Sequence, residues 1–122
     1  MGADTLIWIS LGLFVPAALA GLALARLHWR GKFPPWPLTI LHGLFVAGGV
    51  ITLFIASGPI TTLGILQGII GVFLLAATGG VMVLSFHIRK RHPPRPLMIA
   101  HASGAIAAFL LLLLYALRVI PH

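Results

Sequence analysis

Four long apolar segments, separated by short loops, constrain this 122-residue chain more than any other feature. They run from about residue 4 to 27, 37 to 57, 60 to 86 and 96 to 117. Each reaches the roughly 20 residues that a helix needs to cross a bilayer. Because lipid offers the backbone no hydrogen-bond partners, such segments must be helical. The sequence therefore predicts an all-α membrane protein, with four transmembrane helices in a single domain spanning residues 1–122.

The composition limits the chemistry that such a protein can perform. The chain is 60% hydrophobic and only 7% charged, and its mean hydropathy of +1.12 exceeds that of an ordinary soluble domain. It has no cysteine, which excludes disulfides, covalent c-type haem attachment and iron–sulfur clusters. Asp4 is the only acidic residue, so mechanisms that need a carboxylate pair, carboxylate-bound Mg²⁺ or a Ser-His-Asp triad are excluded.

The basic residues predict the orientation of the chain in the membrane. The net charge of +7 is concentrated in two short loops at one end of the segments, which is a topology signal and does not indicate nucleic-acid binding. By the positive-inside rule, residues 28–36 and 87–95 face the cytoplasm and both termini lie outside. We therefore expect a multi-pass protein of the bacterial inner membrane, with the lipid bilayer as its surroundings. The basic residues at this end are Arg26, Arg30, Lys32, Arg89, Lys90, Arg91 and Arg95.

An internal repeat relates the two halves of the chain. When the sequence is shifted by 59 residues, the first repeat (about residues 4–57) aligns with the second (about residues 60–117) without a gap. Each repeat holds two helices, so both repeats cross the membrane in the same direction and are related by a pseudo-twofold axis along its normal. The sequence thus predicts an up-down four-helix bundle made of two tandem two-helix repeats. Identical pairs include Gly21/Gly80, His28/His87, Arg30/Arg89, Pro34/Pro93, Pro35/Pro94 and His42/His101.

Four of the six histidines belong to this repeat and are the candidate ligands. His28 and His87 end their apolar segments, whereas His42 and His101 lie about five residues inside the following ones. Ionisable side chains within membrane helices are costly and mark functional sites. In an up-down bundle the pseudo-twofold axis brings His42 opposite His101 and His28 opposite His87. We assign no role to the remaining two histidines.

Two facing imidazoles predict a haem site, because imidazole is a common axial ligand of haem iron. Seven residues from each histidine, toward the middle of the membrane, the chain has only Gly or Ala, which leaves room for a flat ligand. These positions are Gly49, Ala108, Gly21 and Gly80. Arg30 and Arg89 could pair with the haem propionates. The pattern suits one central haem b held by His42 and His101, or two haems if His28 and His87 also ligate.

Other functions fit the same residues. Four imidazoles at similar depth suit Zn²⁺ or Cu²⁺, with His28, His42, His87 and His101 as the metal ligands. The chain could also be an accessory subunit of a larger membrane complex, its histidines making only polar contacts. His28 and His87 could be polar caps at the membrane surface. The glycines Gly64, Gly68 and Gly71 indicate close helix packing, either inside the bundle or in a homodimer.

The motif basic-x-P-P-x-P-L-x-x-x-His, with His-x-Arg before it, occurs at residues 28–42 and 87–101. It resembles small bacterial four-helix membrane proteins without an assigned function. More loosely, the paired histidines resemble the b-type cytochromes of the cytochrome b561 kind. That resemblance implies electron transfer with a quinone or another redox protein, as an oxidoreductase component. Cytochromes of that group hold haems near both membrane faces, whereas all four candidate ligands here lie on one side, which argues against a transmembrane electron path.

Overall fold

Four helices account for most of the chain in the computed structural model, which describes residues 1–61 and 63–122. They are α1 (Ala3–Trp29), α2 (Trp36–Ser57), α3 (Ile65–Ile88) and α4 (Arg95–Ala116). Each is long and apolar enough to cross a membrane, and the described residues form no strand. The prediction of an all-α protein with four membrane-spanning helices is confirmed.

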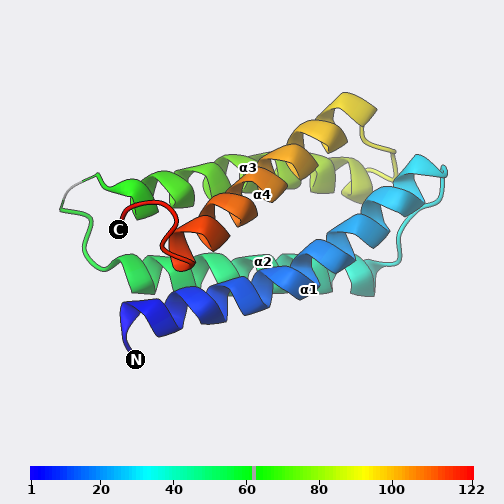
Figure 1. Ribbon diagram of the computed structural model, residues 1–122. Coiled ribbons are helices and arrows are strands. Elements are labelled where there is room, and N and C mark those ends of the chain that lie inside the picture. Colours follow the sequence, from blue (N-terminus) through cyan, green and yellow to red (C-terminus); the bar gives the residue numbers. More distant parts are fainter. Residues whose placement is uncertain (62) are drawn as a thin grey trace.

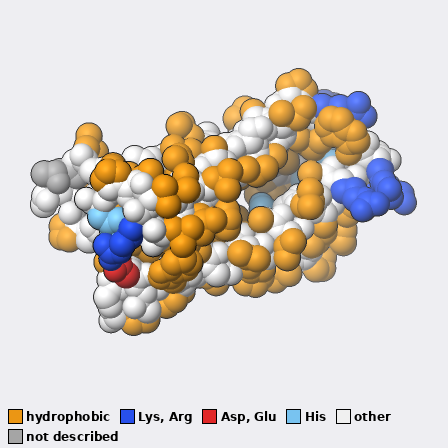
Figure 2. Space-filling view, viewed as in Figure 1, with side chains coloured by type: hydrophobic (Ala, Val, Ile, Leu, Met, Phe, Trp, Pro, Cys, Tyr) orange, Lys and Arg blue, Asp and Glu red, His pale blue; other side chains and the backbone are white. Residues whose placement is uncertain are grey.

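The helices are arranged as an up-down bundle (Figure 1). The closest neighbours are α1 with α2 and α3 with α4, while α1–α4 and α2–α3 contacts close the ring. The backbones of the diagonal pairs, α1 with α3 and α2 with α4, do not approach each other closely. Both termini lie at one end of the bundle, and the two basic loops lie at the other (Figures 1 and 2). We call these the terminal end and the loop end.

Three helix boundaries differ from the sequence-based prediction by two or more residues. The predicted loops begin at His28 and His87, but α1 and α3 continue to Trp29 and Ile88, which places both histidines in the last helical turn. The third helix begins at Ile65 and not near residue 60. Apolar composition alone suggested the earlier start, whereas the local hydrogen bond from Gly64 N–H to Gln67 Oε1, at 3.0 Å, caps the helix at the later position.

The repeat is visible in the way α1 and α3 end. Each helix is followed by a residue with positive φ, Gly31 at +74° and Lys90 at +55°. In both places two backbone N–H groups bond back to carbonyls of the last turn, the pattern of a Schellman motif. The bonds are Gly31 N–H to His28 O (3.0 Å), Lys32 N–H to Leu27 O (2.9 Å), Lys90 N–H to His87 O (3.0 Å) and Arg91 N–H to Phe86 O (2.9 Å). The two halves therefore present their histidines from equivalent helix ends.

The apolar core fills the half of the bundle nearer the terminal end. At its inner boundary Phe14 of α1 and Phe73 of α3, which the repeat makes equivalent, stack with ring centres 4.3 Å apart and planes at 9°. Leu53 and Leu112, from the other two helices, are fully buried beside them. The four candidate histidines, His28, His42, His87 and His101, lie in the other half of the bundle, nearer the loop end.

Candidate functional site

His42 on α2 and His101 on α4 face each other across the bundle. Their ring centres are 6.4 Å apart and their planes are nearly perpendicular, at 89°. Both side chains are half-buried. The face of the molecule seen in Figure 2 is hollowed between α1 and α4. The pairing that the repeat predicted is therefore confirmed, although the two helices that carry the histidines are diagonal neighbours.

Each of these imidazoles makes the same hydrogen bond to the neighbouring helix of its own repeat. His42 Nδ1 lies 2.7 Å from the carbonyl oxygen of Ala17, and His101 Nδ1 lies 2.7 Å from that of Ala76. A carbonyl oxygen can only accept, so Nδ1 carries the proton in both rings. In the neutral imidazole, Nε2 then keeps its lone pair and is free to bind a metal. This arrangement is typical of metal-binding histidines, whose second nitrogen donates to a carbonyl or carboxylate.

Two predicted glycines, Gly21 and Gly80, lie directly against these rings. A Cβ atom at Gly21 would be 2.9 Å from Cε1 of His42, and one at Gly80 would be 2.9 Å from Cε1 of His101. Gly21 follows Ala17 by four residues, and Gly80 follows Ala76 by four. The carbonyl that accepts the hydrogen bond and the space beside the glycine therefore lie on the same face of the helix. In the structure these glycines make room for the imidazoles, whereas the sequence suggested that they border a flat ligand.

The other two small residues, Gly49 and Ala108, are part of the apolar core. A Cβ atom at Gly49 would lie 2.6 Å from Cε1 of Phe14, and Ala108 is fully buried. The carbonyl of Gly49 also accepts a hydrogen bond of 2.8 Å from the buried hydroxyl of Ser10. These positions therefore accommodate side chains of the bundle itself, one layer closer to the terminal end than the histidine pair.

His28 and His87 form a second pair at the loop end, with ring centres 6.2 Å apart and planes at 89°. Both are buried, as the predicted facing arrangement requires. Their hydrogen bonding differs from that of the first pair. His28 Nδ1 lies 3.0 Å from His92 Nδ1, while His87 Nδ1 is buried without a partner among the described residues. The ring of Trp36 lies edge-on to His87 with centres 4.3 Å apart.

His92 is a site residue that the sequence analysis left without a role. Its ring stacks on Phe33, its equivalent in the other repeat, with centres 4.2 Å apart. Because that equivalent is not a histidine, the repeat gave no signal for His92. Ala17 and Ala76 were also missed as site residues, although the repeat pairs them and each stands four residues before a glycine.

The two predicted propionate partners, Arg30 and Arg89, lie at the loop end, two residues beyond His28 and His87. Arg89 Nε donates to Ser85 O at 3.1 Å, and its guanidinium lies 4.7 Å from the ring centre of Phe86. Arg30 is exposed at the C-cap of α1. A second stacking contact at this end joins Arg95 to Trp29, with the guanidinium 4.3 Å from the ring centre. The structure leaves Arg30 available to an acidic group at the surface, whereas Arg89 already has partners.

The histidines do not converge on a single point. Across residues 1–61 and 63–122, no group of three or more His, Cys, Asp or Glu side chains is close enough to hold a metal ion. The four imidazoles instead form two facing pairs. A structural zinc site takes four ligands and a catalytic one takes three. A pair of imidazoles is, by contrast, a complete axial set for haem iron, because the porphyrin supplies the other four nitrogens.

The fold and the site together define a four-helix membrane protein with two carbonyl-bonded histidines facing each other across the bundle. No protein-family model, curated protein or solved structure matches the chain.

Proposed function

We propose that the protein is a membrane b-type cytochrome, which binds haem b through His42 and His101 and transfers electrons. The observation that carries this proposal is the carbonyl bond that each of the two facing imidazoles makes, at the same distance of 2.7 Å in both repeats. These bonds orient both rings before any ligand arrives. They also leave one unprotonated nitrogen on each ring, which is the form that coordinates iron.

The separation of the rings supports the proposal. Metal–imidazole bonds of about 2.0–2.1 Å, with roughly 1 Å from each nitrogen to its ring centre, place two axial imidazoles about 6 Å apart. The ring centres of His42 and His101 are 6.4 Å apart. At this separation His42 and His101 could together hold one haem iron. A bare Zn²⁺ or Cu²⁺ ion is less well supported, because no third ligand from the described residues joins the pair.

The chain's own residues would set the properties of such a site. When bound, haem would accept and donate one electron at a time. Carbonyl bonds from Ala17 and Ala76 make the imidazoles more basic, which stabilises oxidised iron and lowers the reduction potential. Because His42 and His101 would both hold the iron, the site would suit electron transfer and would not suit substrate binding at the metal. The electron partner would be a membrane quinone or another redox protein, near the loop end that the positive-inside rule places in the cytoplasm.

Absorption spectroscopy of the purified protein tests the proposal. With haem available during expression, we expect a Soret band and, on dithionite reduction, a sharp b-type α-band. His42→Ala or His101→Ala should abolish the low-spin spectrum, since each removes one axial ligand. His122→Ala is the matched control, because this histidine bonds to Tyr115 at the terminal end. A folded, colourless wild-type protein, or an unchanged spectrum in both ligand variants, would refute haem binding by this pair.

A further inference from the structure

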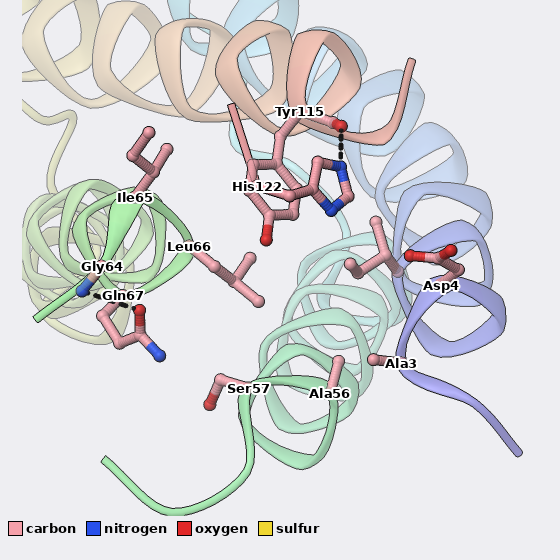
Figure 3. Close-up of a pocket in the computed structure, with 11 residues that line it drawn as sticks. Ala3, Asp4, Ala56, Ser57, Gly64, Ile65, Leu66, Gln67, Tyr115 and His122 are labelled. Carbon is pink, nitrogen blue, oxygen red and sulfur yellow. Dashed lines mark hydrogen bonds between the residues drawn. The ribbon is translucent and has the colours of Figure 1, made fainter. Parts of the chain in front are cut away.

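A cavity of about 240 Å³ lies at the terminal end, far from the histidine pairs (Figure 3). Residues from the ends of all four helices line it, and the C-terminal tail folds back over it. Its walls include apolar side chains such as Ile7 and Leu66. Its polar side chains are those of Asp4, Ser57, Gln67, Tyr115 and His122. The lining is therefore mixed, and polar groups that converge on one space can orient a small molecule.

The hydroxyl group of Tyr115 points into this cavity (Figure 3). The residue is only 8% exposed, and His122 stacks on its ring with centres 4.0 Å apart. The hydrogen bond between the two residues, 2.7 Å long, joins His122 Nε2 to the main-chain carbonyl of Tyr115 and leaves the phenol group unused. None of the described residues bonds to that hydroxyl. The hydroxyl is accessible from the cavity, so it is available to a ligand there.

Gln67 and His122 complete a set of donors and acceptors around that hydroxyl. Gln67 Oε1 accepts from Gly64 N–H at 3.0 Å, which leaves the amide NH₂ group to donate toward the cavity (Figure 3). His122 donates its Nε2–H, so Nδ1 of the neutral ring is an acceptor. A ligand with a hydroxyl group can donate to His122 and accept from Gln67 or Tyr115.

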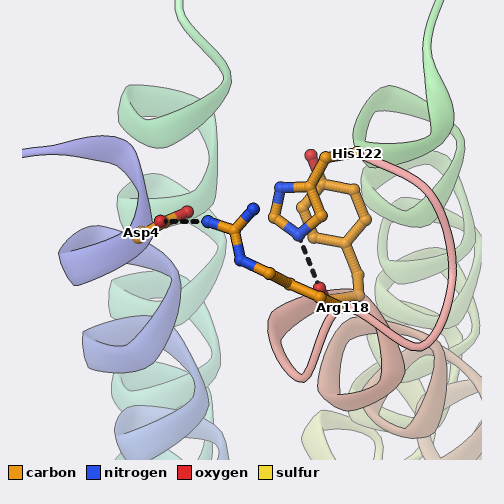
Figure 4. A network of polar contacts seen from close by, with 4 residues as sticks. Asp4, Arg118 and His122 are labelled. Atoms are coloured by element: carbon orange, nitrogen blue, oxygen red, sulfur yellow. Dashed lines mark hydrogen bonds and ion pairs between the residues drawn. The ribbon is translucent and has the colours of Figure 1, made fainter.

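The charge and size of the cavity restrict the ligand further. Asp4, the only acidic side chain at its rim, is paired with Arg118 at 2.7 Å (Figure 4), so no unpaired acidic or basic side chain among the lining residues faces the space. A charged ligand would therefore have no counter-ion there. An apolar cavity of about 150 Å³ holds benzene. A volume of about 240 Å³ accordingly suits a six-membered ring with one or two small substituents.

We propose that this cavity binds a neutral, ring-sized molecule that carries a hydroxyl or carbonyl group. Tyr115, Gln67 and His122 form its hydrogen bonds, while Ile7 and Leu66 contact the ring. The site does not depend on haem binding. Ser57, which borders the cavity, lies 15 residues beyond His42 on α2, a distance of about 22 Å along the helix.

Phenol is a suitable probe, and Tyr115 is a built-in reporter because the chain has one tyrosine. Tyrosine labelled with ¹³C at Cζ gives a single signal in the purified full-length protein. We expect phenol to shift this signal saturably, toluene to bind several-fold more weakly, and benzoate not to bind. Gln67→Leu and His122→Phe, the second of which keeps an aromatic ring over Tyr115, should each weaken phenol binding about three- to tenfold. Thr78→Val, an exposed site on α3, should leave it unchanged.

Three outcomes would overturn this proposal. Shifts by phenol and toluene that are equal and do not saturate would mean partitioning into the detergent only. Binding of benzoate as tight as that of phenol would contradict the requirement for a neutral ligand. Unchanged phenol affinity in both Gln67→Leu and His122→Phe would show that these side chains do not bind the ligand. The titration is read from Tyr115 and not from a haem spectrum, so its result is separate from the test of the proposed cytochrome.

Discussion

The imidazoles of His42 and His101 meet at 6.4 Å between ring centres, although their helices are diagonal in the bundle and their backbones make no close contact. Each ring is held from the side, by a carbonyl and a glycine of the adjacent helix. The separation of the two histidines therefore depends on α1 and α3 as much as on α2 and α4. Residues that never touch a ligand should control whether the pair can bind one.

Enlarging either glycine beside the imidazoles should weaken haem binding. In Gly21→Ala or Gly80→Ala the new Cβ would lie 2.9 Å from Cε1 of the histidine, so the ring must move away from its carbonyl partner. Overpacking of this kind costs about 1–3 kcal/mol, which corresponds to roughly a 5- to 150-fold loss of affinity. Titration of haem into the purified apoprotein, followed at the Soret band, measures the change.

Gly12→Ala and Gly71→Ala are the matched controls for this experiment. They lie on the same two helices, the repeat pairs them, and a Cβ at either would meet nothing within 4 Å. We expect both to bind haem as the wild type does. A similar loss of affinity in all four variants would mean that the glycines act through the helix backbone and not through space for the imidazoles.

The second histidine pair should not bind a haem of its own. His28 is already engaged with His92 at 3.0 Å, and neither His28 nor His87 has the carbonyl bond that orients the first pair. We therefore expect one haem per chain, and we expect His28→Leu and His87→Leu to keep the α-band. Extracted haem divided by protein concentration gives the stoichiometry. A ratio of two, with loss of half the α-band in either variant, would assign His28 and His87 as ligands.

The sequence predicted the helices and the histidine pairing because both follow from long-range regularities. Four apolar segments admit only spanning helices in lipid, and a gapless repeat of two helices places equivalent residues across a twofold axis. The pairing of His42 with His101 needed no knowledge of side-chain packing. The predicted start of α3 was wrong for the opposite reason. The hydrogen bond between Gly64 and Gln67 is local and fixes where the helix begins, and apolar composition does not reveal such a cap.

The contacts that orient the histidines could not be predicted in the same way. The partner of each ring is a main-chain carbonyl, which every residue has, so Ala17 and Ala76 show no distinctive side chain. Gly21 and Gly80 were recognised as small, but whether a glycine makes room for a ligand or for a side chain depends on rotamers. His92 was missed because its contact with His28 joins a loop to a helix of the other repeat.

Cysteine labelling should show the loop end in the cytoplasm. The chain has no cysteine of its own, so a single introduced thiol gives an unambiguous signal. Phe33 and Leu63 are both exposed and lie near opposite ends of the bundle. In intact cells freed of the outer membrane, a membrane-impermeant maleimide should label Leu63→Cys and not Phe33→Cys. Permeabilised cells should label both. The reverse pattern in intact cells would place the basic loops outside, against the positive-inside rule.

The stacked phenylalanines should make the bundle sensitive to the size of residue 49. In Gly49→Ala the added Cβ would lie 2.6 Å from Phe14, whose ring cannot retreat because it stacks on Phe73 at 4.3 Å. We expect a loss of about 1–3 kcal/mol in the free energy of unfolding, measured by denaturant titration in detergent. Gly43→Ala on the same helix, where a Cβ meets nothing within 4 Å, should be neutral or slightly stabilising. Adding Phe14→Leu to Gly49→Ala should restore part of the loss, since the smaller side chain gives the methyl group room. Equal destabilisation by the two alanine substitutions would show that the contact with Phe14 does not limit the packing of α1 against α2.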